Sequence, residues 1–234
     1  MIKRAMILAA GFGKRLQPLT NDCPKPLLKI GNKTLLSNTL ELLNQFGIKE
    51  VVINVHYLQN KIISYIKDNK FKMTITISNE NEEILDTGGG VYNALKHFSN
   101  ESFLVINPDT VWNSLYLKEL KLMEIEFFKK KENKCFILVV NKKKSFDQSF
   151  IGDFNLINNL INRKNKSELN YIYTGAQIIK PEVFLDFKKK VFSINKIWDK
   201  LIENESLYGF ESKVDFLHMS TLKIYKELLK KFKH

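Results

Sequence analysis

Residues 5–28 read AMILAAGFGKRLQPLTNDCPKPLL, and this stretch decides both the fold class and the first candidate site. The apolar run from Ala5 to Ala9 predicts a buried β-strand. Gly11 and Gly13 follow in a loop whose backbone amides can approach phosphate oxygens, and the guanidinium of Arg15 can bridge such oxygens. Ligands of open parallel sheets bind at the carboxyl ends of strands, so this loop is the first candidate phosphate-binding site.

The loop differs from the two common glycine-rich phosphate motifs. Leu16 stands where a dinucleotide-binding motif has its third glycine. The Walker motif fails as well, because Leu8 replaces its first glycine and Arg15 replaces its Ser or Thr. The sequence therefore matches neither motif, although its loop amides and the Arg15 guanidinium can still bind phosphate.

Lys25 lies between two prolines, Pro24 and Pro26. A proline fixes its own φ and biases the preceding residue toward extended backbone, so we expect Lys25 to be extended on a stiff support. An ammonium held in this way suits a charge kept in place for a transition state.

Outward from this stretch, short apolar runs alternate with segments of helical periodicity. The predicted strands are 5–9, 50–55, 73–77 and 102–106, and the predicted helices are 34–46, 58–67 and 89–98. Strands that alternate with helices are typical of right-handed βαβ units. The sequence predicts an α/β, Rossmann-like three-layer fold with a mostly parallel central sheet.

The pattern changes after residue 110. A helix at 115–131 and a strand at 135–140 are followed by two strands, 150–161 and 171–179, joined by the polar loop 162–170. We expect these two strands to form a small antiparallel flap in the C-terminal half. Pro181 opens a short helix, a strand pair lies within 206–219, and Ser220 begins a closing helix. No linker or internal repeat is visible, so residues 1–234 form one domain.

The composition narrows the possible functions. The chain has 234 residues, 44% hydrophobic and 26% charged, which is ordinary for a globular domain. Its formal charge is +12, but only Arg4, Arg15 and Arg163 are arginines, so we expect no nucleic-acid partner while an anionic small substrate remains compatible. No apolar run approaches the roughly 18 residues of a membrane span, and Cys23 and Cys135 are too few for a disulfide framework. We therefore expect a cytoplasmic protein with no membrane partner.

Several motifs together resemble those of the sugar-phosphate nucleotidylyltransferases. The resemblance begins with residues 8–16, 18–20 and 24–27 and continues through 86–90, 107–112, 152–154 and 174–176. Within that family, the Thr-Gly-Gly-Gly run at 87–90 and the Asp-x-Val-Trp at 109–112 are most similar to the N-acetylmuramate 1-phosphate uridylyltransferases of cell-wall recycling. The resemblance covers nearly the whole chain and implies a nucleotide-binding half at 1–110 and a sugar-binding half at 111–234.

The resemblance also implies a reaction and its residues. A sugar 1-phosphate attacks the α-phosphorus of a nucleoside triphosphate with Mg²⁺ present, and pyrophosphate leaves. Such a displacement depends on positioning and charge stabilisation. The implied catalytic residues are Arg15 for pyrophosphate, Lys25 for the reacting phosphates and Asp109 for the metal. The implied nucleotide-binding residues are Leu8, Ala9, Ala10, Gly11, Gly13, Gly88 and Gly89, and the implied sugar-binding residues are Asn107, Asp153 and Gly175.

The chain departs from the family pattern at two positions. Pro108 replaces the glycine that usually precedes the metal-binding Asp, and His218 stands where the family has a second metal-binding Asp. Asp215 lies three residues from that position, which places it on the opposite face of a strand. A neutral imidazole at His218 either ligates the metal, shifting preference from Mg²⁺ toward Mn²⁺ or Co²⁺, or leaves the metal to Asp109 and substrate phosphates. The alternative without a metal role is a histidine packed beside Phe216 and Val214 in a half-buried strand.

Other readings stay open at this stage. A mannose or glucose 1-phosphate nucleotidylyltransferase and a choline-phosphate cytidylyltransferase share the opening motif. The changes at Pro108 and His218 also suit a nucleotide-binding paralogue with impaired catalysis. The sequence predicts neither the base, nor the sugar, nor the oligomeric state.

Overall fold

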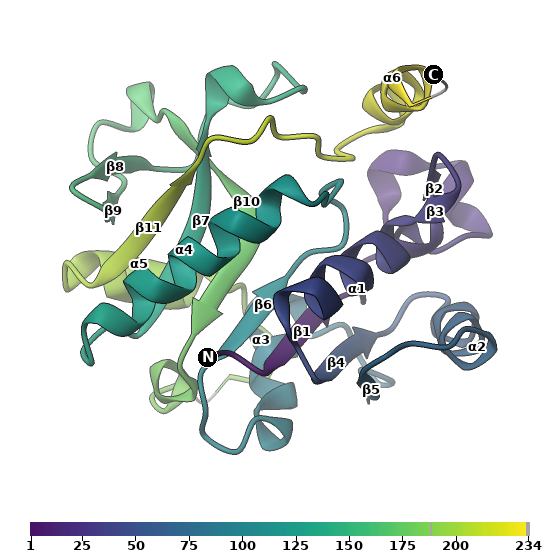
Figure 1. Ribbon diagram of the computed structural model, residues 1–234, viewed down its shortest axis with the longest axis horizontal. Helices are drawn as coiled ribbons and strands as arrows, with labels where there is room; N and C mark the ends of the chain where they lie inside the picture. The colour runs from purple at the N-terminus through teal and green to yellow at the C-terminus, as the bar shows by residue number, and fades with distance from the viewer. Residues whose placement is uncertain (188, 233–234) are drawn as a thin grey trace.

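The computed structural model describes residues 1–187 and 189–232, apart from the side chain of Lys166, and it confirms the three-layer α/β fold (Figure 1). A nine-stranded sheet in this described part has the order β5-β4-β1-β6-β10-β7-β11-β9-β8. Its strands are β1 (Arg4–Leu8), β4 (Glu50–Val55), β5 (Thr74–Asn79), β6 (Phe103–Ile106), β7 (Cys135–Asn141), β8 (Asn155–Ile157), β9 (Leu160–Asn162), β10 (Tyr171–Ile179) and β11 (Leu207–Ser212). The strands β1, β4, β5 and β6 pair in parallel, whereas β10 is antiparallel to both β6 and β7.

Helices cover both faces of this sheet. They are α1 (Leu35–Phe46), α2 (Gln59–Asp68), α3 (Asp86–Ala94), α4 (Leu115–Lys129), α5 (Asn195–Glu203) and α6 (Leu222–Lys231). Because side chains alternate along a strand, Ile7 and Met6 of β1 enter different cores. Helices α1 and α4 pack on the Ile7 side, and α3 and α5 pack on the Met6 side (Figure 1). Among the described residues, no helix combines the length and apolar character that crossing a bilayer requires.

Local chemistry explains where two helices begin. The hydroxyl of Thr34 accepts the amide of Ser37 at the start of α1, and that helix ends at Gly47, whose φ is +106°. The closing helix was predicted to begin at Ser220. Its N-cap is instead Thr221, which accepts the amide of Ile224, because the Ser220 hydroxyl donates to Asp147.

The C-terminal half differs from the predicted element list. The single strand predicted at 150–161 is wrong, since β8 and β9 form a hairpin whose turn residues Asn158 and Asn159 have positive φ. The strand pair predicted within 206–219 is also wrong. Only β11 is a full strand there, and the later residues form isolated bridges. Helix α5, which buries Ile197 and Trp198, was missed.

The segment that carries Lys25 is a turn. A small hairpin of β2 (Lys29–Ile30) and β3 (Lys33–Thr34) follows a 3₁₀ helix at Lys25–Leu27. The expectation of extended backbone at Lys25 is therefore wrong. The amide of Leu28 donates to the carbonyl of Lys25 at 3.1 Å, and Pro26 occupies a helix-start position where its missing N–H costs nothing.

Candidate active site

A cavity of about 210 Å³ lies where the first parallel strands end. It is lined by Leu8 at the end of β1 and Ala9, Ala10 and Gly11 after it, by Lys25 and Pro26, by Asn54, Glu80, Ile84, Asp86 and Thr87, and by Asn107, Pro108 and Asp109 after β6. The parallel strands β1, β4, β5 and β6 all end at the edge where these residues gather. The structure thus brings the first loop together with Lys25 and Asp109 at the edge where ligands of such sheets bind.

The side chains of Lys25 and His218 both contact Asp109. The Nζ of Lys25 lies 2.5 Å from Asp109 Oδ2, and the Nε2 of His218 lies 3.1 Å from the same oxygen. All three side chains are largely buried, with exposed fractions from 13% to 19%. Burial raises the pKa of Asp109, but Lys25 and His218 outweigh it and hold that pKa far below its ordinary value. Asp109 is therefore a carboxylate at neutral pH.

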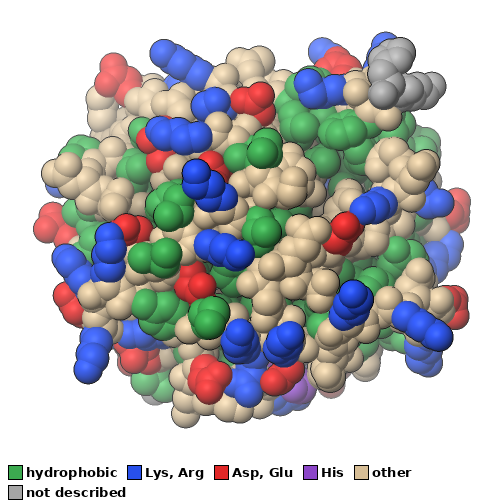
Figure 2. Space-filling view, viewed as in Figure 1, with side chains coloured by type: hydrophobic (Ala, Val, Ile, Leu, Met, Phe, Trp, Pro, Cys, Tyr) green, Lys and Arg blue, Asp and Glu red, His purple; other side chains and the backbone are tan. Residues whose placement is uncertain are grey.

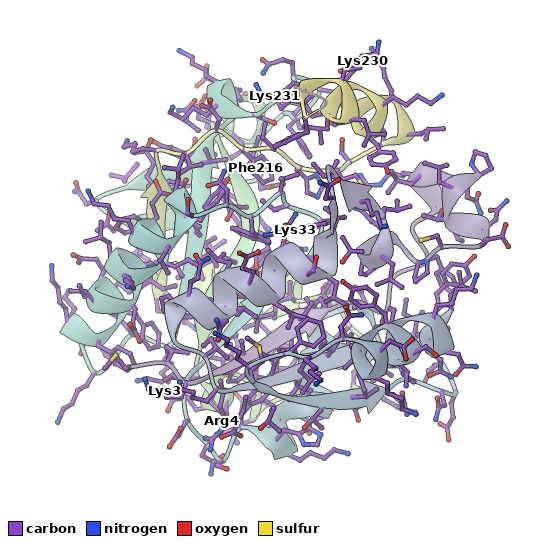
Figure 3. All side chains as sticks on the ribbon, turned by 45° about the vertical axis from the view of Figure 1, so that its right-hand side comes forward. Lys3, Arg4, Lys33, Phe216, Lys230 and Lys231 are labelled. Carbon is purple, nitrogen blue, oxygen red and sulfur yellow. The ribbon has the colours of Figure 1, made fainter. Side chains whose placement is uncertain are left out.

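Backbone pairing places His218 beside Asp109. Residues 217–219 run antiparallel to 109–111: the amide of Val111 donates to Leu217 at 2.8 Å, and the amide of Met219 donates to Asp109 at 2.9 Å. The His218 ring stacks on Phe216, with ring centroids 5.5 Å apart, and Phe216 belongs to the segment between β11 and α6 (Figure 3). The structure therefore brings His218 to Asp109. Neither His218 nor Asp215 lines the cavity itself; the side chain of Asp215 is 77% exposed, and its Oδ1 lies 3.4 Å from Lys144 Nζ.

The residues around Asp109 fit a divalent cation whose coordination shell is completed by the substrate. The second carboxylate oxygen, Asp109 Oδ1, is buried and has no hydrogen-bond partner. His218 Nδ1 is likewise buried and unpartnered. Within residues 1–187 and 189–232, no group of three or more His, Cys, Asp and Glu side chains could hold a metal. Mg²⁺ commonly takes one or two carboxylates and completes its shell with water and substrate phosphates. One free carboxylate oxygen therefore suits it.

Of the three residues implied for the sugar, Asn107 lines the cavity, whereas Asp153 and Gly175 do not. The Oδ1 of Asn107 is buried without a partner. Gly175, with φ +99°, accepts the Asn107 amide at 2.7 Å, and a Cβ on Gly175 would lie 3.0 Å from the Asn107 Cβ. Asp153 is exposed and accepts the amide of Tyr173 at 2.9 Å. Asn107 and Gly175 are thus in direct contact, and Asp153 lies along β10.

Arg15 and three glycines implied for ligand binding lie away from this cavity. Arg15 is exposed on a 3₁₀ helix, Lys14–Leu16, and does not line it. Gly13 has φ +65°, and a Cβ there would approach Thr20 at 2.9 Å, which explains the glycine without a ligand. Gly88 and Gly89 are buried against the 190–194 segment, where a Cβ would meet the Phe192 ring at 2.5 Å or the Lys190 carbonyl at 2.2 Å. Asp86 and Thr87 line the cavity in their place.

Asn54 and Glu80 form a buried pair that the sequence analysis missed. Asn54 Oδ1 accepts the amide of Ala9 at 2.8 Å, and its Nδ2 donates to Glu80 at 2.7 Å. The second Glu80 oxygen accepts the amide of Leu85 at 2.8 Å. The Ala9 amide is thus occupied by the protein, which leaves the following residues of the loop to meet a ligand. An asparagine within the apolar strand EVVINV was the available signal.

Comparison with known proteins places this geometry in a family. The family profile described as nucleotidyl transferase matches residues 4–210. The N-acetylmuramate alpha-1-phosphate uridylyltransferase of Caulobacter vibrioides is 29% identical over 222 residues, covering 93% of this chain and 91% of that protein. The mannose-1-phosphate guanyltransferase 2 of Candida glabrata is 30% identical over 217 residues, covering 89% of this chain and 58% of its own length. The crystal structure of HddC from Yersinia pseudotuberculosis superposes with a TM-score of 0.75 and 26% identity, covering 99% of this chain and 100% of that chain.

Proposed function

The chain belongs to the nucleotidyl transferase family, and from that premise we propose that it condenses a sugar 1-phosphate with a nucleoside triphosphate. An oxygen of the sugar phosphate attacks the α-phosphorus and forms a new P–O bond. The bond between the α-phosphorus and the bridging oxygen to the β-phosphorus breaks, and that oxygen leaves with pyrophosphate. The products are a nucleoside diphosphate sugar and pyrophosphate.

The observation that carries the proposal is the Lys25–Asp109 pair inside the cavity. A phosphoryl group gathers negative charge as bonds form and break, so a preorganised ammonium stabilises it. The Lys25 side chain is 13% exposed and its Nζ already lies 2.5 Å from a carboxylate oxygen, so the ammonium is held in place before substrate arrives. The loop at Ala10 and Gly11 opens onto the same cavity and gives the phosphates room to approach the backbone.

Asp109, with the imidazole of His218 beside it, would hold a divalent cation. When bound, that cation polarises phosphate oxygens and offsets the charge of the triphosphate. The protein supplies the buried, unpartnered Oδ1 of Asp109 for this purpose. Arg15 lies on the adjacent 3₁₀ helix, and we propose that it contacts the departing pyrophosphate from the solvent side.

For the substrates we propose N-acetylmuramate 1-phosphate and UTP. This choice is supported by how much of each relative the chain matches. It matches 91% of the length of the Caulobacter uridylyltransferase but 58% of the length of the Candida guanyltransferase. Mannose 1-phosphate with GTP is the second candidate, favoured by the slightly higher 30% identity of that relative.

The experiment is pyrophosphate release over a panel of sugar phosphates and nucleoside triphosphates, with choline phosphate and CTP included. The proposal predicts the highest kcat/KM for N-acetylmuramate 1-phosphate with UTP. Turnover of choline phosphate alone would contradict the sugar assignment. Nucleotide binding without release under every condition would indicate an impaired paralogue.

His218→Asp tests the metal side of the proposal. A carboxylate is a harder ligand than imidazole, so the variant is expected to shift relative activity from Mn²⁺ toward Mg²⁺. Activity with each metal, measured on wild type and variant side by side, checks this. An unchanged ratio of the two activities would remove His218 from the metal site.

A further inference from the structure

The outer face of α4 exposes apolar side chains mixed with lysines. Four apolar residues on it, Leu115, Leu122, Ile125 and Phe128, are 40% to 64% exposed. Lys118, Lys121 and Lys129 are exposed on the same helix. In the shared view of Figures 1 and 2, green apolar and blue lysine side chains alternate over α4. We call these seven residues the α4 face.

The acidic residues of α4 all have partners within the protein. Glu119 is buried and accepts from the Ser212 hydroxyl and the Lys213 amide. Glu124 accepts the amide of Ile2, and Glu126 pairs with Lys129 at 2.5 Å. No ion pair in the described part of the chain involves Lys118 or Lys121. The α4 face therefore presents apolar surface and uncompensated positive charge together.

The apolar surface continues past the end of the helix. Phe128 borders a second cavity, of about 880 Å³, together with Met1 and Leu185, which are 88% and 82% exposed. None of these residues, and none of the α4 face, lines the candidate active site. A partner on this side would leave that site open.

The residue types on the α4 face indicate which kind of partner it fits. Protein interfaces are enriched in Arg and aromatic residues and depleted in Lys, whereas the α4 face contains three lysines, no arginine and a single aromatic residue, Phe128. A second copy of a chain with charge +12 would bring like charges together. Surfaces that bind anionic bilayers combine exposed Leu and Phe, which enter the lipid interface, with lysines, which anionic headgroups attract. We infer that the α4 face docks on negatively charged lipid bilayers.

This inference does not depend on the proposed function. The sequence predicts no membrane partner, because no segment is long enough to span a bilayer. Peripheral docking needs no such segment, only exposed apolar side chains and unpaired lysines gathered on one helix.

Vesicle flotation with the full-length protein tests the inference. Vesicles of phosphatidylglycerol mixed with phosphatidylcholine are expected to carry the protein upward, and phosphatidylcholine alone is not. The double variant Leu122→Gln with Ile125→Gln keeps the charge and should weaken binding on the order of tenfold or more. The double variant Lys118→Gln with Lys121→Gln should also weaken binding to these vesicles, and the remaining binding should depend less on salt concentration. Ile157→Gln removes an apolar residue elsewhere that is 61% exposed, more than Leu122 or Ile125, so it is the control and should bind like wild type.

Three results would overturn the inference. One is no flotation at any phosphatidylglycerol content. Another is flotation that Leu122→Gln with Ile125→Gln leaves intact, since that would be unspecific adsorption of a basic protein. The third is a dimer in solution that the same apolar variant dissociates, since the face would then bind a second copy. Thermal unfolding of each variant, expected near the wild-type Tm because the residues are exposed, shows that loss of binding is not loss of fold.

Discussion

Two glycine-to-alanine variants should separate ligand contact from packing. Gly11 and Gly89 were both implied to bind nucleotide, but their surroundings differ. Gly11 lines the candidate active site, and a Cβ there meets nothing within 4 Å. Gly89 is buried in α3, where a Cβ would lie 2.2 Å from the Lys190 carbonyl oxygen, and its amide donates to Phe192 at 2.9 Å. Gly11→Ala should therefore affect binding, and Gly89→Ala should affect stability.

The magnitudes follow from these contacts. For Gly89→Ala the obstacle is backbone, so relief requires moving the 190–192 segment, at an overpacking cost of about 1–3 kcal/mol. Alanine recovers about 1 kcal/mol in a helix interior, leaving a net loss of about 0–2 kcal/mol and a Tm lower by up to about 8 °C. For Gly11→Ala the free energy of unfolding should stay within about 0.5 kcal/mol of wild type. Its added methyl occupies space at the cavity wall, so affinity for triphosphate should fall about tenfold or more, which is about 1.4 kcal/mol or more.

Thermal unfolding and calorimetric titration with UTP and GTP, well below the lower Tm, measure both effects on both proteins. Wild-type affinity in Gly89→Ala together with weakened affinity in Gly11→Ala is the expected outcome. The reasoning is refuted if folded Gly89→Ala loses affinity as strongly as Gly11→Ala, because the α3 glycines would then contact nucleotide. It is equally refuted if Gly11→Ala binds like wild type.

Two further predictions concern charge. Lys25→Ala removes the ammonium 2.5 Å from Asp109 and should lower kcat on the order of 100- to 1000-fold in pyrophosphate release; Lys33→Ala, an exposed lysine paired with Glu41, is the control and should retain full rate. Burial raises the pKa of Asp147, but hydrogen bonds from Ser149 and Ser220 outweigh it, so the pKa lies below its ordinary 3.8. That carboxylate contributes stability above its ordinary pKa and loses it as pH falls through the lowered value, so Asp147→Asn should flatten the acid limb of unfolding free energy below about pH 4. The free energy of unfolding is measured by denaturant titration at several pH values. If its dependence on pH below about pH 4 is the same in the variant and the wild type, Asp147 does not have this role.

The sequence was most informative where local pattern and fold agree. The alternating runs from Ala5 to Ile106 predicted four parallel strands and the helices between them, because burial on both faces requires continuous apolar strands. Beyond residue 150 the prediction failed at the β8–β9 hairpin and at α5. Strands of three residues carry too little periodicity to be recognised, and the paired asparagines 158–159 were the one turn signal.

For the site, the amino-acid sequence by itself determined which chemical groups are available: a loop of small residues, a lysine between two prolines, and an aspartate at a strand end. Tertiary structure decided which of these meet. Only the pairing of 217–219 with 109–111 put His218 at Asp109, since residues a hundred positions apart share no local signal. Only packing assigned Gly88 and Gly89 to the 190–194 segment and joined Asn54 to Glu80 behind the Ala9 amide. A motif specifies which groups are available, whereas long-range contacts between elements fix which of them face the same cavity and which are used to hold its walls together.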